Sequence, residues 1–461
     1  MEEIVLLHTN DLHSHFENWP KIRRFLREKK TEQTIDKSIF TVDLGDFVDR
    51  WHPLTEATDG RANVQLMNTV NYDAATIGNN EGVGNSKSQL NALYDEANFD
   101  VLLGNLYDPT TGKRPTWTKT HKILETPSRT KLGLIALTAP FPLTYEPNGW
   151  DIRTVDEVLP ALIQEVRSTC DVLVLMSHLG IDQDMKIATK YPEIDVLLGS
   201  HTHHLFRYGE KINHTQLSAA GKFGQYVGEV RIFLENGKII ETSAEALSTE
   251  SFAECVEDAA EIEGYLEQGH KLLKKKKLAK LPYELSHELD SLHPVIFEAL
   301  KAVKKRGQTT AAVLNTGLFL GNLPKGVVTE DNLHQLLPHP MHLIRVTLAG
   351  ADMIRFIREM EKNRHFLRKF SIVGMGFRGK IFGDLVYDGI SYDKATKTAY
   401  WDGQELEADK SYTITTVDHF LFIPFFPTLE LAGKVEFLFP EFIRNVLGDY
   451  LRRYYPINKK A

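Results

Sequence analysis

Two histidines that could bind a metal ion follow a short apolar run near the middle of the chain. The run covers residues 194–198, and Gly199 ends it just before His201 and His203. A short apolar run ended by glycine is typical of a buried strand, and neutral imidazole is a common metal ligand. Taken alone, the histidine pair is equally compatible with a hydrogen-bonding role at the surface.

Side chains of the same chemical kind follow four earlier apolar runs. In chain order these side chains are Asp11 with His13, Asp46, Asn79 and His178. Helical patterns alternate with the apolar runs, and this alternation predicts a layered α/β domain with buried strands. Ligands of open α/β sheets gather beyond the carboxyl ends of the strands. We therefore expect all seven side chains to converge.

The residue types of this set indicate the chemistry. Aspartate, asparagine and histidine without a thiolate suit Zn, Mn, Fe, Co or Mg. Seven ligands fit two divalent ions that share the carboxylate of Asp46. Two ions about 3.5–4 Å apart lower the pKa of a bridging water toward ~7 and neutralise phosphate oxygens, which suits in-line attack on phosphorus. Singly, each residue also has a structural explanation, such as a helix cap for Asp46 or a turn for Asn79.

The motifs around these residues resemble those of calcineurin-like metallophosphoesterases. The motifs are Asp11-x-His13, Gly45-Asp46-x-x-Asp49-Arg50, Gly78-Asn79-x-Glu81, Ser177-His178 and Gly199-x-His201-x-His203. Residues 8–13 more narrowly resemble the two-domain 5′-nucleotidase family, which includes 2′,3′-cyclic nucleotide phosphodiesterases and UDP-sugar hydrolases. The resemblance implies one ion on Asp11, His13, Asp46 and His203, and a second on Asp46, Asn79, His178 and His201.

The resemblance also implies the architecture. A four-layer α/β-β-α metallophosphoesterase sandwich would precede a smaller α+β domain that supplies a nucleotide pocket. The length of 461 residues independently favours two domains. We expect a dimetal catalytic domain at residues 1–245, a helical linker at 246–281 and a 5′-nucleotidase C-terminal-like domain at 282–461. Residues 216–219 and 226–234 are expected to be antiparallel strands that finish the first domain.

Asn80 occupies a position at which the family usually has histidine. An imidazolium can protonate the leaving oxygen, whereas an amide can only form a hydrogen bond to it. Our hypothesis is that Asp46 and Asn80 are the catalytic side chains and that Asn80 keeps a positioning role. Acid assistance is then weakened or comes from His15 or His204.

The second domain departs from the family pattern as well. The family's Asn-Gly-Gly-x-x-Arg segment corresponds to residues 315–320, so Asn315 is retained and Leu320 replaces the substrate-binding arginine. Leucine cannot pair with an anion. We expect Phe420 to stack on a base, with Phe382 or Phe377 as the opposite ring. Core packing of all three phenylalanines is the alternative.

Composition restricts the class of partner and the location. A net charge of −8 argues against an extended nucleic-acid surface, so the expected partner is a small phosphoester such as a nucleotide. No segment has the pattern of a signal sequence or a membrane span. Two cysteines do not indicate a disulfide framework. We expect a cytoplasmic protein.

The expected function is that of a dimetal-dependent phosphoester hydrolase, a 5′-nucleotidase-like enzyme of nucleotide catabolism. One alternative is a phosphatase or phosphodiesterase for a non-nucleotide or cyclic-nucleotide substrate. Another is a metal-retaining binding protein with weakened catalysis.

Overall fold

The computed structural model describes residues 1–372, 374 and 376–457, and the chain divides into two compact units. Unit 1 is Met1–Gly269 and unit 2 is His270–Ala461. The division falls within helix α9 (Asp258–Lys275). The domain boundaries expected from the sequence, at residues 245 and 282, lie on either side of this division and stay predictions.

Unit 1 contains two mixed sheets. The first has the strand order β15-β14-β1-β2-β3-β4-β6, and the second has the order β12-β13-β11-β10-β8-β7. The strands of the first sheet are β1 (Glu2–Thr9), β2 (Lys37–Asp43), β3 (Ala74–Ala75), β4 (Asp100–Leu102), β6 (Thr118–Lys119), β14 (Tyr226–Glu235) and β15 (Lys238–Ser248). Those of the second are β7 (His121–Glu125), β8 (Lys131–Thr138), β10 (Val172–His178), β11 (Val196–Gly199), β12 (Glu210–Ile212) and β13 (Thr215–Ala219).

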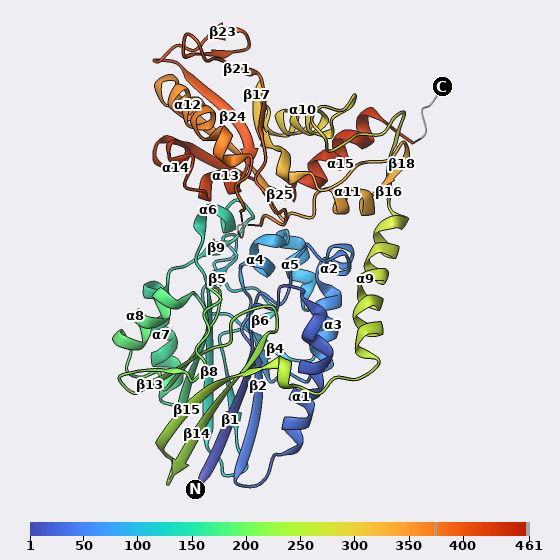
Figure 1. Ribbon diagram of the computed structural model, residues 1–461. Helices are drawn as coiled ribbons and strands as arrows, with labels where there is room; N and C mark the ends of the chain where they lie inside the picture. Colours follow the sequence, from blue (N-terminus) through green and yellow to red (C-terminus); the bar gives the residue numbers. More distant parts are fainter. Residues whose placement is uncertain (373, 375, 458–461) are drawn as a thin grey trace. The chain divides into compact units, whose positions relative to one another are not determined.

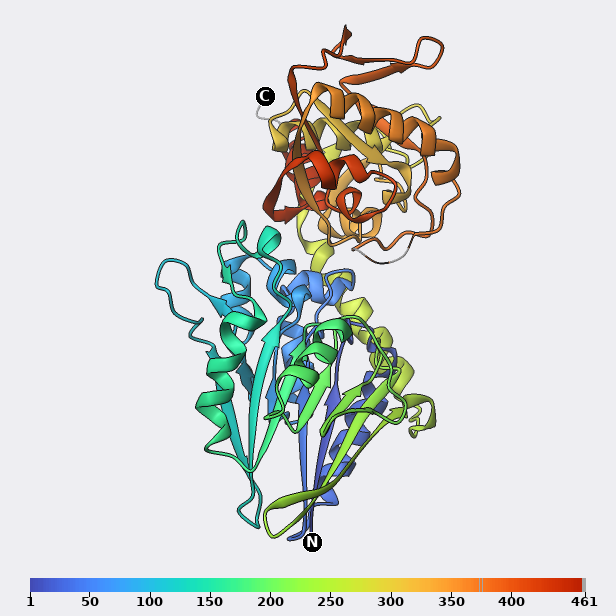
Figure 2. The same cartoon turned by 90° about the vertical axis from the view of Figure 1, so that its left-hand side faces the viewer.

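The alternation of side chains along the strands produces four layers. In β1, Ile4 and Leu6 join a core cluster with β8, β10 and β11 of the other sheet, whereas Val5 and Leu7 join a cluster with helices. Successive strand residues point to opposite faces, so each sheet is covered on both sides. Helices α1 (Trp19–Thr31) and α3 (Arg61–Asn68) cover the first sheet, and α7 (Val155–Arg167) and α8 (Ile181–Lys190) cover the second (Figures 1 and 2). This arrangement confirms the expected sandwich.

Unit 2 is smaller and has the expected mixed α/β composition. Its main sheet has the order β20-β17-β24-β19-β25 and packs with helices in one continuous core. These strands are β17 (Ala311–Asn315), β19 (His342–Ala349), β20 (Leu385–Asp388), β24 (Ser411–Val417) and β25 (Lys434–Phe442). The larger helices are α10 (Val295–Gly307), α12 (Gly350–Leu367) and α15 (Ile443–Tyr454).

Two local expectations were wrong in part. Residues 216–219 and 226–234 are strands as expected, but β13 is antiparallel only to β12 and lies parallel to β11, whereas β14 is antiparallel to both of its neighbours. The helix expected at 246–281 is limited to α9, and Lys277–Leu281 forms strand β16 with β18 (Gly326–Thr329). In β16 the apolar residues Leu278, Ala279 and Leu281 are buried in the core of unit 2, and this tertiary burial overrides the local helical pattern.

None of the helices in the described part of the chain has the length and apolar character needed to span a bilayer.

Candidate metal centre

The predicted ligands follow strands that end at one edge of unit 1. In the first sheet Thr9 at the end of β1 pairs with Asp43 at the end of β2, and in the second Ser177 of β10 pairs with Gly199 of β11. Both strand pairs are parallel, so each pair brings its carboxyl ends together. Helix α4 (Asn79–Gly84) begins with the predicted ligand Asn79.

Many of these ligands have an unusual backbone conformation. A positive φ occurs at Asp11 (49°), His13 (50°), Asp46 (53°), His201 (75°) and His203 (59°). For residues with a side chain this left-handed region costs roughly 1–2 kcal/mol each. Such strain persists only where surrounding structure imposes it, and it clusters at functional sites.

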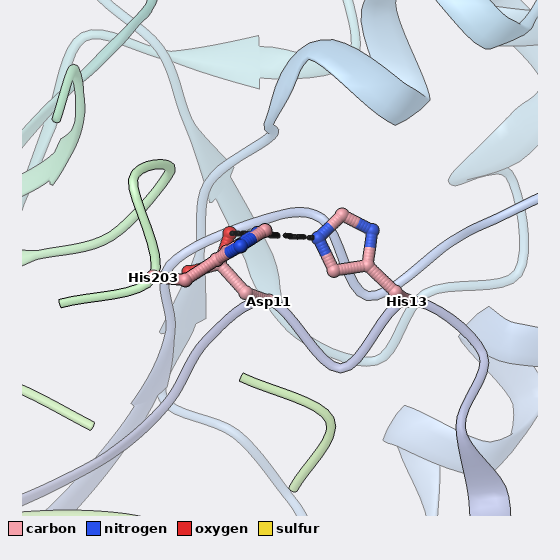
Figure 3. A group of neighbouring side chains, drawn as sticks. All are labelled: Asp11, His13 and His203. Carbon is pink, nitrogen blue, oxygen red and sulfur yellow. Dashed lines mark hydrogen bonds and ion pairs between the residues drawn. The ribbon is translucent and has the colours of Figure 1, made fainter. Parts of the chain in front are cut away.

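Asp11, His13 and His203 form the first group of potential ligands (Figure 3). The Nε2 atoms of His13 and His203 are 3.0 Å apart, and Oδ1 of Asp11 lies 3.8 Å and 3.7 Å from them. Donors around a tetrahedral ion with bonds of ~2.0–2.1 Å are about 3.3 Å from each other. The three side chains therefore have the spacing of ligands to one cation.

Asp11, Asp46 and His178 form the second group. Oδ2 of Asp46 lies 3.5 Å from Nε2 of His178 and 3.6 Å from Nε2 of His13. The carboxylate of Asp46 is thus close to an imidazole of each group, as a carboxylate shared by two ions must be.

The remaining predicted ligands lie beside the second group. The ring of His201 is 5.2 Å from that of His178, and its backbone N–H donates to the Asp11 carboxylate at 3.1 Å. Oδ1 of Asn79 and Nε2 of His178 are buried and have no hydrogen-bond partner among the described residues. Buried polar atoms without partners are costly, and a cation would satisfy both. The donor set therefore fits divalent ions.

Charge interactions within the centre change the pKa values of its side chains. Burial opposes charge on both His178 and Asp46, but their mutual attraction outweighs it. The pKa of His178 is raised to about 10, and that of Asp46 is lowered, so an ion that binds Nε2 of His178 must displace its proton. Burial together with the neighbouring His178 lowers the pKa of His201 to about 4, and burial together with His13 lowers that of His203 to about 3. His201 and His203 are therefore neutral at pH 7, which is the form that binds metal.

Asn80 contacts a potential ligand. Its side-chain nitrogen lies 2.9 Å from Nδ1 of His13, and its backbone N–H donates to Oδ1 of Asp46 at 2.8 Å. Oδ2 of Asp49 lies 3.5 Å from the same Nδ1 of His13. If Nε2 of His13 binds an ion, Nδ1 carries the proton, and Asp49 or the rotated amide of Asn80 accepts it.

Glu81 is not among the predicted site residues, but the structure places its carboxylate at the base of the centre. Its buried carboxylate accepts hydrogen bonds from the backbone N–H groups of Asp46 (2.9 Å), Val48 (2.9 Å) and Gly78 (2.8 Å). Burial and the nearby Asp46 charge raise its pKa to about 7. The contact from Glu81 back to the N–H of the N-cap residue Gly78 is one half of a capping box, and the spacing of three residues could have indicated it.

The substrate-binding residues expected in unit 2 belong to its core. The side chains of Phe420, Phe382 and Asn315 are fully buried. The rings of Phe382 and Phe420 are 5.6 Å apart, and Phe420 stacks on Phe426 at 5.1 Å. Nδ2 of Asn315 donates to the backbone oxygen of Phe382 at 2.6 Å. In this structure no base fits between the two phenyl rings, so their nucleotide-binding role stays a prediction.

The four-layer fold and the two ligand groups are those of a two-domain metallophosphoesterase. Residues 4–205 match the calcineurin-like phosphoesterase family, and residues 285–423 match the 5′-nucleotidase C-terminal domain. The chain is 35% identical to "Uncharacterized metallophosphoesterase YunD" of Bacillus subtilis, over 97% of this chain and 98% of the relative. The chain therefore belongs to the calcineurin-like phosphoesterases, a family that uses divalent metals, and is a metal-dependent phosphoester hydrolase.

Other similar proteins have names that refer to nucleotides. The "Trifunctional nucleotide phosphoesterase protein YfkN" of Bacillus subtilis is 23% identical over 76% of this chain and 27% of its own length. The solved structure of a putative 5′-nucleotidase from Staphylococcus aureus has a TM-score of 0.68 and 18% identity, over 99% of this chain and 98% of that one. The NAD nucleotidase of Haemophilus influenzae has a TM-score of 0.65 and 13% identity, over 98% and 96%. The two structures share the fold with this chain.

Proposed function

We propose that this protein is a two-metal hydrolase that cleaves nucleotides or closely similar small phosphoesters. The observation that carries the proposal is the position of the Asp46 carboxylate, 3.6 Å from Nε2 of His13 and 3.5 Å from Nε2 of His178. In the proposed site Asp11, His13, Asp46 and His203 hold one ion, and Asp46, Asn79, His178 and His201 hold the other.

The roles of the side chains follow from this arrangement. Two divalent ions held by these residues would supply a water of lowered pKa as nucleophile and would neutralise charge on the phosphate oxygens. Asp46 fixes the spacing of the two sites, and its own position is fixed by the backbone N–H of Asn80. The Asn80 amide orients His13 and can donate a hydrogen bond at the edge of the centre, but it has no proton to give to a leaving group.

A nucleotide substrate is supported by the match of unit 2 to the 5′-nucleotidase C-terminal domain and by the names of several relatives. The proposed contacts are Asn315, Phe382 and Phe420, which must become accessible to a base for this role. Hydrolysis of a non-nucleotide phosphomonoester or a cyclic nucleotide is the other outcome that substrate profiling can give. A role in nucleotide catabolism in the cytoplasm is the expected setting.

The test combines metal analysis with substrate profiling on one preparation. We expect about two divalent ions per chain and hydrolysis of 4-nitrophenyl phosphate and nucleoside monophosphates.

Asp46→Asn should lose at least 100-fold in kcat/KM, because it removes the carboxylate shared by both ions. Asp182→Asn is a matched control, since Asp182 is an exposed acid on α8. One ion per chain, or undiminished activity of Asp46→Asn, would contradict the two-metal proposal. Activity restricted to non-nucleotide or cyclic substrates would contradict the nucleotide assignment.

A further inference from the structure

A loop at residues 220–225 holds an aromatic ring beside the candidate metal centre and an ammonium beside that ring. The ring of Phe223 lies 5.9 Å from the ring of His13 and 6.4 Å from that of His203. The ammonium of Lys222 lies 4.6 Å from the centre of the same phenyl ring. The sequence pattern does not connect this loop with the centre, because residues 220–225 contain no aspartate, asparagine or histidine.

Hydrogen bonds attach this loop to the segments that carry the proposed ligands. The backbone N–H of Phe223 donates to the backbone oxygen of Asp11 at 2.8 Å. Nδ2 of Asn10 donates to the backbone oxygen of Gly221 at 2.8 Å, and the N–H of Gly221 donates to the oxygen of His204 at 2.8 Å. The loop therefore has a fixed position relative to the centre.

The conformation of Phe223 is costly and is supported by neighbouring rings. Its φ is +59°, in a region that bulky side chains rarely adopt. The ring of His15 lies 3.9 Å from that of Phe223 and 4.8 Å from that of Trp51, whose Nε1–H donates to the backbone oxygen of His13 at 2.8 Å. These contacts hold the phenyl ring against the centre, and the ammonium of Lys222 lies over that ring.

The charge of Lys222 is available for a ligand. Its ammonium contacts the face of Phe223, a weak attraction at a partly exposed site. No carboxylate forms an ion pair with Lys222 among residues 1–372, 374 and 376–457. Ions bound by the proposed ligands would neutralise the phosphoryl group that is cleaved, whereas the ammonium of Lys222 lies over a ring outside the ligand set.

We propose that Lys222 binds a second negatively charged group of the substrate, next to the phosphoryl group that is cleaved. Lys222 is then a specificity-determining residue that favours substrates with two adjacent anionic groups, such as a diphosphate, over those with one. This inference rests on the proposed function, because it places the cleaved phosphoryl group at the metal centre.

The test compares ADP with AMP, which differ by one phosphate. Each is used as a non-hydrolysable analogue in which a methylene group replaces the oxygen of the bond that would be cleaved, and its binding to the metal-loaded full-length protein is measured by calorimetry for the wild type, Lys222→Ala and Lys222→Arg. Lys211→Ala is the control. Lys211 is exposed and lies opposite Gln216 in the neighbouring strand, at the end of β13 that is far from the centre.

We expect the wild type to bind ADP at least tenfold more tightly than AMP. Lys222→Ala should weaken ADP binding about tenfold and reduce the ratio of affinities to under threefold. Lys222→Arg and Lys211→Ala should keep the ratio. An unchanged ratio in Lys222→Ala, an equal loss for AMP and ADP, or no ADP preference in the wild type would overturn the inference.

Hydrolysis of 4-nitrophenyl phosphate by the wild type reports separately on the proposed function. Hydrolysis combined with an unchanged ratio in Lys222→Ala would leave the enzyme assignment in place and remove only the role of Lys222.

Discussion

Asn80 replaces the histidine that the family usually has, while the seven proposed metal ligands are all present. The same position can therefore have a different role in this protein. Its amide lies 2.9 Å from Nδ1 of His13, and its backbone N–H holds Asp46. A side chain at this distance controls which tautomer of His13 is present and how the ring is turned. We therefore expect Asn80 to act mainly through a metal ligand.

Asn80→Ala should weaken metal binding about 10–100-fold, because residues that orient a metal ligand typically contribute that much. Metal titration of the apoprotein, followed by calorimetry, measures the effect. Asn91→Ala is the control, because Asn91 is exposed and its side chain contacts Trp117, which is not a residue of the centre. Unchanged metal affinity together with reduced turnover would show that Asn80 acts on the substrate directly.

His419 is a second residue whose surroundings determine its behaviour. It is fully buried in unit 2, and neither ring nitrogen has a hydrogen-bond partner among the described residues. Its ring lies 5.7 Å from that of Phe382 and 5.8 Å from that of Phe377. Burial and the nearby His339 lower the pKa of His419 from 6.5 to about 3.

His419→Leu should raise the free energy of unfolding by about 1–3 kcal/mol at pH 7, because it removes unpaired buried polar atoms. In the wild type the unfolded chain binds a proton at His419 near pH 6.5, whereas the folded chain binds it only near pH 3. The contribution of His419 to the free energy of unfolding therefore decreases as the pH is lowered from 7 toward 4. The pKa of Asp418 is raised to about 7, so Asp418 changes the free energy of unfolding with pH in the opposite direction. Both proteins contain Asp418, so the difference between wild type and variant reports on His419.

Urea unfolding at pH 7 and pH 5 measures both effects. The stabilisation by His419→Leu should be larger at pH 5. His365→Leu, at an exposed position of α12, should change neither value by more than a few tenths of a kcal/mol. A destabilised His419→Leu variant with unaltered pH dependence would show that a partner satisfies the imidazole.

At the level of elements, the centre depends on how closely the connections after β2 and β3 approach each other. A Cβ on Gly45 would lie 2.3 Å from the backbone nitrogen of Gly78, and Gly45 has a φ of +90°. A Cβ on Gly78 would lie 2.0 Å from Oδ1 of Asp46 and 2.5 Å from Cε1 of His178. Only glycine leaves room for both side chains at the start of α4.

Gly78→Ala should therefore displace Asp46 or His178 and reduce metal affinity and kcat/KM by at least tenfold. Its cost in stability should be about 1–3 kcal/mol, as for other overpacked positions. Gly84→Ala is the control, because Gly84 ends the helix that Gly78 caps and a Cβ on Gly84 meets no atom within 4 Å. Equal activities of the two variants would contradict the close approach. Metal content and thermal unfolding of both variants give the comparison.

At the level of the whole molecule, all seven proposed ligands belong to unit 1, and each unit has its own core. A ligand that binds only the folded form stabilises the part of the molecule that holds it. Metal binding should therefore affect the two units differently.

Removal of the metal with a chelator should abolish hydrolysis and lower the unfolding temperature of unit 1 while unit 2 is little changed. At a free metal concentration 100 times Kd the lost stabilisation is about 2.7 kcal/mol. Hydrogen exchange with and without chelator can assign the change to each unit. Re-addition of the metal should restore both properties. Equal loss of protection in the core of unit 2 would indicate a ligand there as well.

Much of unit 1 could be predicted from the sequence because its signals are local. Apolar runs interrupted by helical patterns identify buried strands, and polar residues directly after the runs identify the edge at which ligands gather. The spacing of the motifs around Asp11, Asp46 and His178 indicated the family, and the family fold predicted the four layers. The strand β16 was missed because its pairing partner, β18, begins almost fifty residues later.

The sequence by itself determined which side chains could bind metal and that an amide replaces an imidazole at position 80. Only the tertiary structure decided which side chain that amide contacts and which backbone N–H groups Glu81 binds. It also decided that Phe420 is buried in a core and that Lys222 contacts a ring next to the centre. The reason is physical: ligand types and strand patterns are properties of short segments, whereas contacts between residues two hundred positions apart depend on how the sheets pack and how each connection leaves its strand.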